Sequence, residues 1–320
     1  MNRVYRLGIA MSVTMFAACS GSGGKSALRP EAQWRAMNLL ERGVRAQQKS
    51  EIQQAEHFLI GALANSSSIE DNPTRIIVLI NLARLNRLNS NPVIAVEYAD
   101  QALHLCAEYP ELLAEAAYEK AHIELDLNNH DEALSWAATS LNAESGSLKG
   151  VRRNLLARIQ FTAGDTIAAT LSATIARQEN QCGLLPEEEA NSLRILGTVE
   201  LENGQLDTAK KLILEALEID KRIGASTKIG LDLKKLAAIA ERSGNLNSTA
   251  EYLERALSVH LAAGRLEKAA QILQQLSKVY DKTGNITQVE KTLQALEQLK
   301  RSKPSYPHST AESAKPSSKP

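Results

Sequence analysis

Residues that could perform acid–base, nucleophilic or metal chemistry are scattered along this sequence. The six histidines are His57, His104, His122, His130, His260 and His308. A zinc-binding helix places two histidines about four residues apart so that both reach one ion, and no pair here has that spacing. The sequence also lacks a Cys-x-x-Cys motif and a nucleophile elbow, and catalysis needs such groups held in a pocket that excludes water. We therefore predict that the protein is not an enzyme and needs no metal or cofactor.

A glycine-rich stretch near the N-terminus, Gly21-Ser22-Gly23-Gly24-Lys25-Ser26, matches the last part of a phosphate-binding P-loop. The full motif requires another glycine five residues before its last one, and that position is Cys19. A P-loop also joins a strand to a helix, and the sequence indicates neither a strand before this stretch nor a clear helix start at Lys25. We interpret residues 19–30 instead as a flexible Gly/Ser tether.

The first eighteen residues have the features of an export signal. Arg3 and Arg6 supply a positive start, and residues 7–18 form a mostly apolar run. This run is too short to span a bilayer, which takes about 20 apolar residues. It ends in Phe16-Ala17-Ala18-Cys19, which resembles the lipobox of bacterial lipoproteins, although Phe16 stands where that motif usually has an aliphatic residue. The resemblance implies that residues 1–18 are a lipoprotein signal peptide and that Cys19 becomes the lipid-modified N-terminus.

The residue after the cysteine is Ser20 rather than Asp, which resembles the sorting pattern for the outer membrane. The resemblance therefore implies a location in the cell envelope, anchored by lipid to the outer membrane and facing the periplasm. A plain secretory signal and an N-terminal membrane anchor are the alternatives.

The composition favours closely packed helices and gives no sign of nucleic-acid binding. Ala, Leu and Ile dominate the apolar residues, and aromatic residues make up only 4% of the chain. The formal net charge is +0 with both signs interspersed, whereas nucleic-acid binding proteins usually carry a basic patch. After Pro30 a helical pattern of apolar residues continues to about residue 300, with no sustained alternation of β-branched residues. We predict an all-α fold.

A forty-residue sequence repeat occurs twice between Gly197 and Gly264, so that Gly204, for example, corresponds to Gly244. One slot of the pattern recurs every 36 to 40 residues along the chain and holds Ala55, Ala95, Ala133, Ala169, Ala209, Thr249 and Val289. Small residues also recur twelve places before and seven places after this slot, as at Gly197 and Ala216. Small side chains let the two backbones of a helical hairpin approach closely. The sequence therefore predicts seven helical hairpins.

These small slots resemble the tetratricopeptide repeat (TPR) in its long-period variants, with leucines beside one slot at Leu82, Leu156, Leu196, Leu236 and Leu276. The resemblance covers residues 31–300. It implies a right-handed α-α superhelical solenoid of about seven TPR-like hairpins, in which the first helix of each hairpin lines the concave side. The terminal repeats should be atypical because one side of each lacks a neighbour. Residues 301–320 are rich in Ser, Pro and Lys and are predicted to form a disordered tail.

The TPR resemblance also indicates a recognition surface, because first helices in that family direct residues at fixed offsets into the concave groove. In this sequence the offsets select Arg84, Arg87, Tyr118, His122, Asn154, Arg158, Phe161 and Arg194. Arginine can bind a carboxylate with two parallel hydrogen bonds, asparagine can hold a peptide backbone, and aromatic rings add contact area. The groove is thus expected to take a protein or an extended, acidic peptide segment. The alternative is that these are ordinary solvated residues on a helix surface.

Two classes of function follow from these features. The first is a membrane-anchored TPR scaffold or adaptor that mediates protein–protein interaction at the periplasmic face of the cell envelope and helps to assemble an envelope complex. Its partners would be a protein segment and, through the N-terminal lipid, a membrane, but no nucleic acid. The alternative is a ligand-responsive or peptide-responsive TPR sensor or regulator, because long-period TPR variants also bind small peptides.

Four further residues carry smaller predictions. Cys106 and Cys182 lie two repeats apart, which in a regular solenoid exceeds the limit of about 7 Å between the Cα atoms of a disulfide. We predict that they stay unpaired, as buried or unreactive thiols. Trp34 and Trp136 are expected to serve in helix packing.

Overall fold

The computed structural model describes residues 31–301, and that part of the chain contains helices and no strand. The predicted signal peptide, Cys19, the tether and nearly all of the C-terminal tail lie outside the described residues, so those predictions stay open. The chain divides into two compact units, with the division between Ala225 and Ser226. Each unit is described separately.

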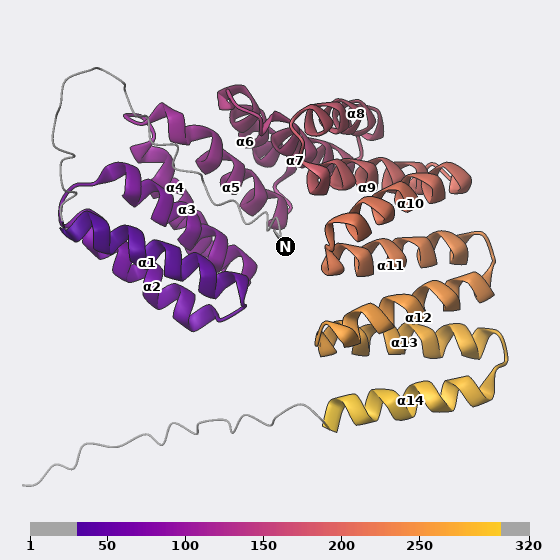
Figure 1. The fold of residues 1–320 in the computed structure, drawn as a ribbon. Coiled ribbons are helices and arrows are strands. Elements are labelled where there is room, and N and C mark those ends of the chain that lie inside the picture. Colours follow the sequence, from indigo (N-terminus) through magenta and orange to yellow (C-terminus); the bar gives the residue numbers. More distant parts are fainter. Residues whose placement is uncertain (1–30, 302–320) are drawn as a thin grey trace, which may run out of the picture. The chain divides into compact units, whose positions relative to one another are not determined.

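Unit 1 contains five helical hairpins, in which the first helix packs along the second. They are α1 (Glu31–Gln48) with α2 (Ile52–Ser67), α3 (Asn72–Leu88) with α4 (Pro92–Leu105), α5 (Leu113–Asp126) with α6 (His130–Ala143), α7 (Lys149–Thr162) with α8 (Thr166–Cys182), and α9 (Pro186–Glu202) with α10 (Leu206–Ile223). A short 3-10 helix, η1 (Pro110–Leu112), precedes α5. Each second helix also packs against the first helix of the next hairpin, so the hairpins stack in chain order (Figure 1).

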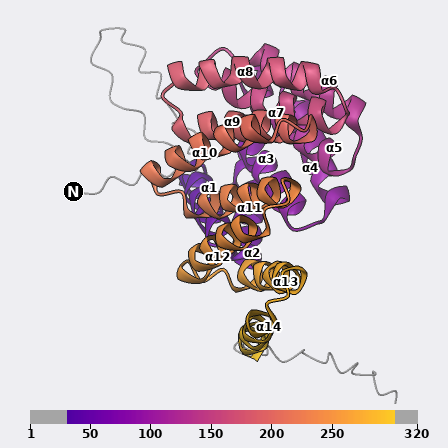
Figure 2. The ribbon, with the colours of Figure 1, turned by 90° about the vertical axis from the view of Figure 1, so that its right-hand side faces the viewer.

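Unit 2 contains two hairpins, α11 (Ser226–Arg242) with α12 (Leu246–Ala262) and α13 (Leu266–Lys282) with α14 (Ile286–Arg301). These four helices lie side by side in chain order (Figure 1, Figure 2). The described residues therefore form seven hairpins. The predicted all-α class and the predicted set of TPR-like hairpins are confirmed.

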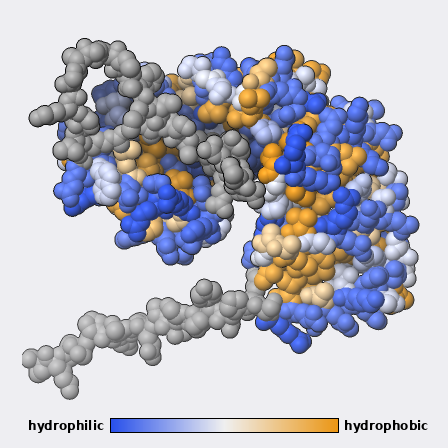
Figure 3. Space-filling view, viewed as in Figure 1, coloured by the Kyte–Doolittle hydropathy of each residue, from blue (hydrophilic) through white to orange (hydrophobic). Residues whose placement is uncertain are grey.

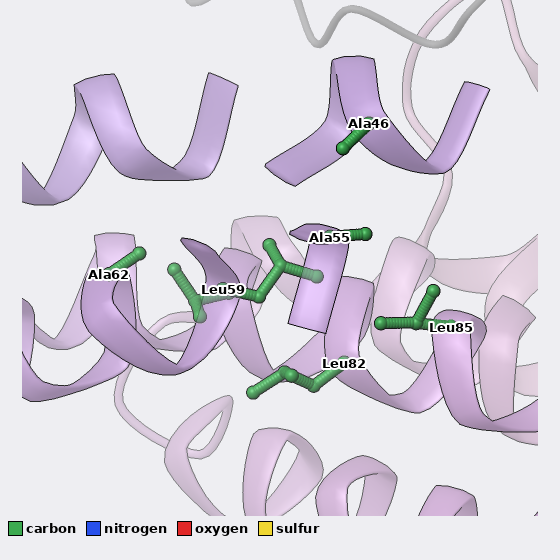
Figure 4. Close-up of a cluster of buried hydrophobic side chains, with 7 residues drawn as sticks. Ala46, Ala55, Leu59, Ala62, Leu82 and Leu85 are labelled. Atoms are coloured by element: carbon green, nitrogen blue, oxygen red, sulfur yellow. The ribbon is translucent and has the colours of Figure 1, made fainter. Parts of the chain in front are cut away.

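The predicted small residues lie where the two helices of a hairpin come closest. A Cβ atom on Gly43 would lie 2.8 Å from Cδ2 of Leu59, and one on Gly197 would lie 2.7 Å from Cδ1 of Ile213. Carbon atoms in contact normally lie about 3.5–4.0 Å apart, so a larger residue would force these side chains to move. Larger residues fill the space between hairpins. In the first two hairpins the buried cluster consists of Ala46, Ala55, Leu59, Ala62, Val78, Leu82 and Leu85 (Figure 4).

The turn inside each hairpin contains one residue with a positive φ angle. In the last four hairpins this residue is a glycine, namely Gly164, Gly204, Gly244 or Gly284. In the first three it is Ser50, Ser90 or Asn128, with φ between 60° and 62°. Residues other than glycine seldom adopt such angles. The glycine signal that marks the later repeats in the sequence is therefore missing from the earlier ones, although the same turn is formed.

The first helices of unit 1 form one continuous row. Neighbouring first helices contact one another along the series α1, α3, α5, α7 and α9. Among the described residues of unit 1, neighbouring second helices make no contacts of that extent. Neighbouring hairpins of unit 1 thus approach each other more closely on the side of the first helices than on the side of the second helices. The TPR resemblance expects the groove on the side of the first helices. We call this side the inner wall.

The two tryptophans have different environments. Trp136 is half-buried and packs against a cluster that includes Ala133 and Leu155. Trp34 is 61% exposed, so the prediction that it serves in helix packing is wrong. The reason is its place in the first hairpin, because no hairpin of unit 1 covers the outer side of a terminal repeat.

The two cysteines in the described part of the chain are unpaired, as predicted. Cys106 is buried and Cys182 is exposed. Burial, and then the charge of Glu111, raises the pKa of the Cys106 thiol to about 11. The thiolate is the reactive form of cysteine, so Cys106 is an inert core residue at neutral pH.

Candidate binding surface on the first helices

Two of the selected arginines lie on α3 and are paired with carboxylates of α5. The guanidinium of Arg84 donates to Glu119 and to Glu115, both at 2.8 Å. The guanidinium of Arg87 donates to Glu119 at 2.7 Å and to Asp126 at 3.0 Å. The Glu119 side chain is only 1% exposed and accepts from both arginines. These ion pairs join the second hairpin to the third and engage both guanidinium groups within the wall.

The network continues to α7 through Arg152, a residue that the TPR offsets do not select. Arg152 donates to Glu115 at 2.7 Å and to Glu144 at 3.3 Å. Burial alone would raise the pKa of Glu115, but the charges of Arg152 and Arg84 outweigh burial and lower it. Burial alone would likewise lower the pKa of Arg84, and its two glutamates raise it. We call this set the arginine–carboxylate network; it consists of Arg84, Arg87, Glu115, Glu119, Asp126, Glu144 and Arg152.

Tyr118 and His122 lie on α5 beside this network. Their ring centres are 4.7 Å apart with the rings edge to face, and the guanidinium of Arg152 lies 4.5 Å from the centre of the Tyr118 ring. Burial, and then the charges of Arg87 and Arg158 among the nearby arginines, hold the pKa of His122 well below its usual value. The ring is therefore neutral at pH 7. Its Nδ1 atom is buried and has no hydrogen-bond partner among the described residues.

Arg158 is the one of the four selected arginines that is exposed. No carboxylate in residues 31–301 forms an ion pair with it. Burial dominates the pKa shifts of His122 and Tyr118, but the charge of Arg158 contributes to both, so the three groups are close enough to interact. Phe161 is half-buried and follows by three residues on the same side of α7. We call Tyr118, His122, Arg158 and Phe161 the open patch.

The structure places the last two selected residues, Asn154 and Arg194, in contacts between helices. Nδ2 of Asn154 on α7 donates to the backbone carbonyl of Glu188 at 2.9 Å, and its Oδ1 accepts from Ser192 of α9 at 2.7 Å. Arg194 on α9 is 4% exposed and pairs with the fully buried Asp220 of α10. Both side chains thus hold neighbouring helices together, and neither belongs to the accessible part of the inner wall.

A hollow of about 610 Å³ lies elsewhere in unit 1, over α8, α9 and α10. Its apolar lining includes Leu193 and Leu214. The charged lining residues are Arg177, Lys210, Lys211 and Arg222 against Glu189, Asp207, Glu215 and Glu218. Arg177 also spans from α8 to α10, where it donates to Glu215 at 3.0 Å. The balanced charges select for no ligand of either sign, so the open patch is the stronger candidate.

Within residues 31–301, no group of three or more His, Cys, Asp and Glu side chains is placed to hold a metal ion. No helix in the same range is both long enough and apolar enough to cross a membrane.

Comparisons with known proteins show the fold. The sequence matches no family model and no curated relative, but many solved structures are similar. One is a signal transduction ATPase with numerous domains from Pyrococcus horikoshii that contains a tetratricopeptide repeat sensor. The TM-score is 0.62 at 14% identity, over 82% of this chain and 41% of that one.

Two further structures are similar over most of their own length. A Rap protein complexed with competence and sporulation factor gives a TM-score of 0.60 at 16% identity, over 85% of this chain and 76% of that one. PilW, a type IV pilus biogenesis factor, gives a TM-score of 0.53 at 14% identity, over 74% of this chain and 98% of that one. The chain therefore has the TPR-like fold, an array of helical hairpins, and within unit 1 the first helices form a continuous row.

Proposed function

We propose that the protein is a membrane-anchored scaffold at the periplasmic face of the cell envelope, and that it binds an extended segment of a partner protein on the inner wall of unit 1. Lipid attached at Cys19 would hold the chain to the membrane, and the hairpin array would recruit the partner to that surface. The segment would carry an acidic side chain or a terminal carboxylate and would lie across the open patch.

The observation that carries this proposal is the composition of the open patch. Arg158 has an unpaired guanidinium, which can bind a carboxylate with two parallel hydrogen bonds. His122 is neutral and therefore adds no second charge to the patch; its Nδ1 is buried and is not available to a partner. The rings of Tyr118 and Phe161 add apolar contact area. A cation beside two aromatic rings matches the groups of an acidic peptide segment.

The arginine–carboxylate network gives this patch a fixed frame. Its ion pairs link α3, α5 and α7 across three hairpins, and Arg152 also stacks on Tyr118. A surface held in its binding geometry loses less side-chain entropy when a partner binds. Arg84 and Arg87 thus fix α3 against α5, the helix that carries Tyr118 and His122, and Arg158 is the group that would make the direct contact.

Site-specific cross-linking can test the patch in native membranes. A photoreactive phenylalanine analogue at position 161 of the full-length protein should give one main adduct with a partner protein. Arg158→Glu should abolish that adduct, because a second carboxylate would then face the acidic segment. The matched control is Arg255→Glu on α12, where the arginine side chain is 42% exposed and lies on a second helix. An adduct that survives Arg158→Glu would contradict the proposed contact.

Fractionation tests the anchor independently of the groove. Cys19→Ser removes the thiol that would carry the lipid, so the variant should leave the membrane fraction while the natural chain stays in it. Mass spectrometry of the N-terminal peptide shows the lipid directly. A Cys19→Ser chain that remains in the membrane would rule out lipid attachment as the anchor.

A peptide-responsive sensor is the second candidate function, and the similarity to a Rap protein complexed with competence and sporulation factor favours it. A sensor changes conformation on binding, because a ligand shifts an equilibrium only when it prefers one of two states. A scaffold has no such requirement. Hydrogen exchange, measured with and without the cross-linked segment, distinguishes a scaffold from a sensor. Protection confined to α5 and α7 indicates a scaffold, whereas changes throughout both units indicate a sensor.

A further inference from the structure

We propose that the outer side of α1 docks on the surface of the membrane, with Trp34 among the lipid headgroups. The occupant of this surface is a bilayer that contains anionic phospholipid. The proposal rests on the lipid anchor of the proposed function and adds a second contact, made by a folded helix. Such a contact would orient unit 1 on the membrane instead of leaving it to move freely on its tether.

Trp34 is the first observation. Its side chain is 61% exposed, although tryptophan is buried on average more than most residues. An indole ring combines a large apolar surface with one N–H donor, and this combination favours the boundary between headgroups and acyl chains. Trp34 lies close to the start of α1, and therefore close to the end of the segment that leads from Cys19.

The charge around Trp34 is the second observation. The exposed residues of α1 and of the turn after it recur at helical spacing, so they form one stripe along the helix. Its charged members are Arg35, Arg42, Arg45 and Lys49 against Glu31 and Glu41. Four basic residues less two acidic ones leave a charge of +2, whereas the whole chain has a formal charge of +0. The face of α1 turned to the viewer in Figure 3 is mostly hydrophilic.

The excess charge belongs to two particular residues. Arg35 pairs with Glu31, and Arg45 pairs with Glu41. Arg42 and Lys49 remain, and the guanidinium of Arg42 is held 4.1 Å from the centre of the Phe58 ring of α2. Basic side chains at a membrane surface are attracted to anionic headgroups. The stripe therefore offers an interfacial aromatic ring and a positive excess on one side of one helix.

The length of chain between Cys19 and α1 is the third observation. Twelve residues, 19–30, span at most about 40 Å when fully extended. A lipid on Cys19 would therefore keep the first turn of α1 within about that distance of the bilayer. Linking two contacts through so few residues raises the effective concentration of the second one. The α1 stripe would thus bind the membrane in the lipid-anchored protein even with an affinity too low to bring the unlipidated protein to the membrane.

Fluorescence of a single tryptophan tests the docking. The chain has two tryptophans, so Trp136→Phe leaves Trp34 as the only emitter. The full-length lipidated protein is reconstituted into vesicles of phosphatidylcholine and phosphatidylglycerol at about 3:1, and its quenching by aqueous acrylamide is compared with that of the unlipidated Cys19→Ser chain in solution. We expect quenching on the vesicles to fall at least threefold and the emission to move to shorter wavelength. Vesicles of phosphatidylcholine alone should protect Trp34 less, and so should the Lys49→Glu variant.

A matched control uses another exposed position of unit 1. Leu171 on α8 is 62% exposed, nearly the same as Trp34. In a chain with Trp34→Phe, Trp136→Phe and Leu171→Trp, the new tryptophan should remain open to acrylamide on the same vesicles. Circular dichroism of each variant verifies that the helices are retained.

Three results would overturn the proposal. The first is equal quenching of Trp34 on vesicles and in solution. The second is equal protection at positions 34 and 171, which would mean that the whole surface is shielded without a preferred face. The third is protection in native membranes but not on pure lipid, which would assign the α1 stripe to a protein partner. Loss of the anchor itself is recognised separately, by the absence of lipid from the N-terminal peptide.

Discussion

Glu119→Gln is the substitution that best separates the structural role of the inner wall from its proposed role in binding. Glu119 accepts hydrogen bonds from Arg84 at 2.8 Å and from Arg87 at 2.7 Å, and its side chain is 1% exposed. Glutamine keeps the shape and one acceptor oxygen but replaces the other oxygen with an NH2 group. That group would face a guanidinium donor, and glutamine carries no charge, so both ion pairs of Glu119 are lost and two N–H donors are opposed.

The loss of unfolding free energy depends on which hydrogen-bond partners Arg84 and Arg87 keep. Breaking a buried ion pair typically costs about 3–5 kcal/mol, and one hydrogen bond to a charged group contributes about 1.5–3 kcal/mol. Arg84 keeps its bond to Glu115 and Arg87 keeps its bond to Asp126. The arginine side chains are also 21% and 14% exposed, so water can partly replace the lost partner. We therefore expect unit 1 to lose about 2–3 kcal/mol of unfolding free energy.

Urea and thermal unfolding, followed by circular dichroism, measure this loss. For a unit of this size we expect Tm to fall by about 4–12 °C, since 1 kcal/mol corresponds to about 2–4 °C. Glu218→Gln is the control, because Glu218 is 68% exposed and pairs with Lys221 within one turn of α10. An exposed pair of this kind contributes at most about 1 kcal/mol. The two variants make the same chemical change at a buried and at an exposed site.

Two results would refute this reasoning. A Glu119→Gln chain within about 0.5 kcal/mol of the natural one would show that the network adds nothing to stability. A loss as large for Glu218→Gln would show that burial is irrelevant. The bonds of Arg84 to Glu115 and of Arg87 to Asp126 remain and keep the frame of the patch, while the inner wall carries one negative charge fewer. Cross-linking of an acidic segment at position 161 should therefore increase even though stability falls.

The remaining predictions concern the core, pH and thiol reactivity. Ala216 is fully buried on α10, so Ala216→Glu should bury an unpaired carboxylate and lower the unfolding free energy by at least about 4 kcal/mol. The folded circular dichroism signal of unit 1 should then disappear, whereas Ala216→Ser should lower the unfolding free energy far less. Burial, and then Arg265 and nearby lysines, lower the pKa of His260 below its unfolded value near 6.5. The unfolded state then binds more protons, so the stability that neutral His260 provides is complete above about pH 6.5 and is lost as pH falls towards the folded pKa. Between pH 7.5 and pH 5, the Tm of the natural chain should therefore fall more than the Tm of the His260→Gln variant. Parallel Tm curves for the two chains would contradict this. Maleimide should label the exposed Cys182 in the native protein and Cys106 only after unfolding, as mass spectrometry of the labelled peptides can verify.

Much of the fold could be predicted because the repeat pattern reports contacts inside one hairpin. Gly43 and Gly197 are small because a Cβ atom at either position would meet the facing helix, and this restriction recurs at a fixed spacing. The turns were less regular in sequence. Ser50, Ser90 and Asn128 adopt the positive φ angle that later repeats assign to glycine, so their role became visible only in the backbone.

The candidate site could be predicted less completely. The TPR offsets selected Arg84 and Arg158 on the correct helices, but the offsets treat them alike. Arg84 is engaged by Glu119, 35 residues away on the next first helix, whereas Arg158 has no such partner in residues 31–301. Arg152, which stacks on Tyr118, has no position in the repeat that distinguishes it beforehand.

The class of fold, the number of hairpins and the residues at which helices touch could be predicted from the sequence, because these features depend on spacing within about forty residues. The sequence also supplied the predictions for Cys19 and the membrane. Tertiary structure decided which charges are neutralised, that Arg194 is buried against Asp220, and that Trp34 is exposed. The physical reason is that ion pairing and burial depend on how neighbouring hairpins are positioned against one another, and no spacing rule within a single repeat specifies that arrangement.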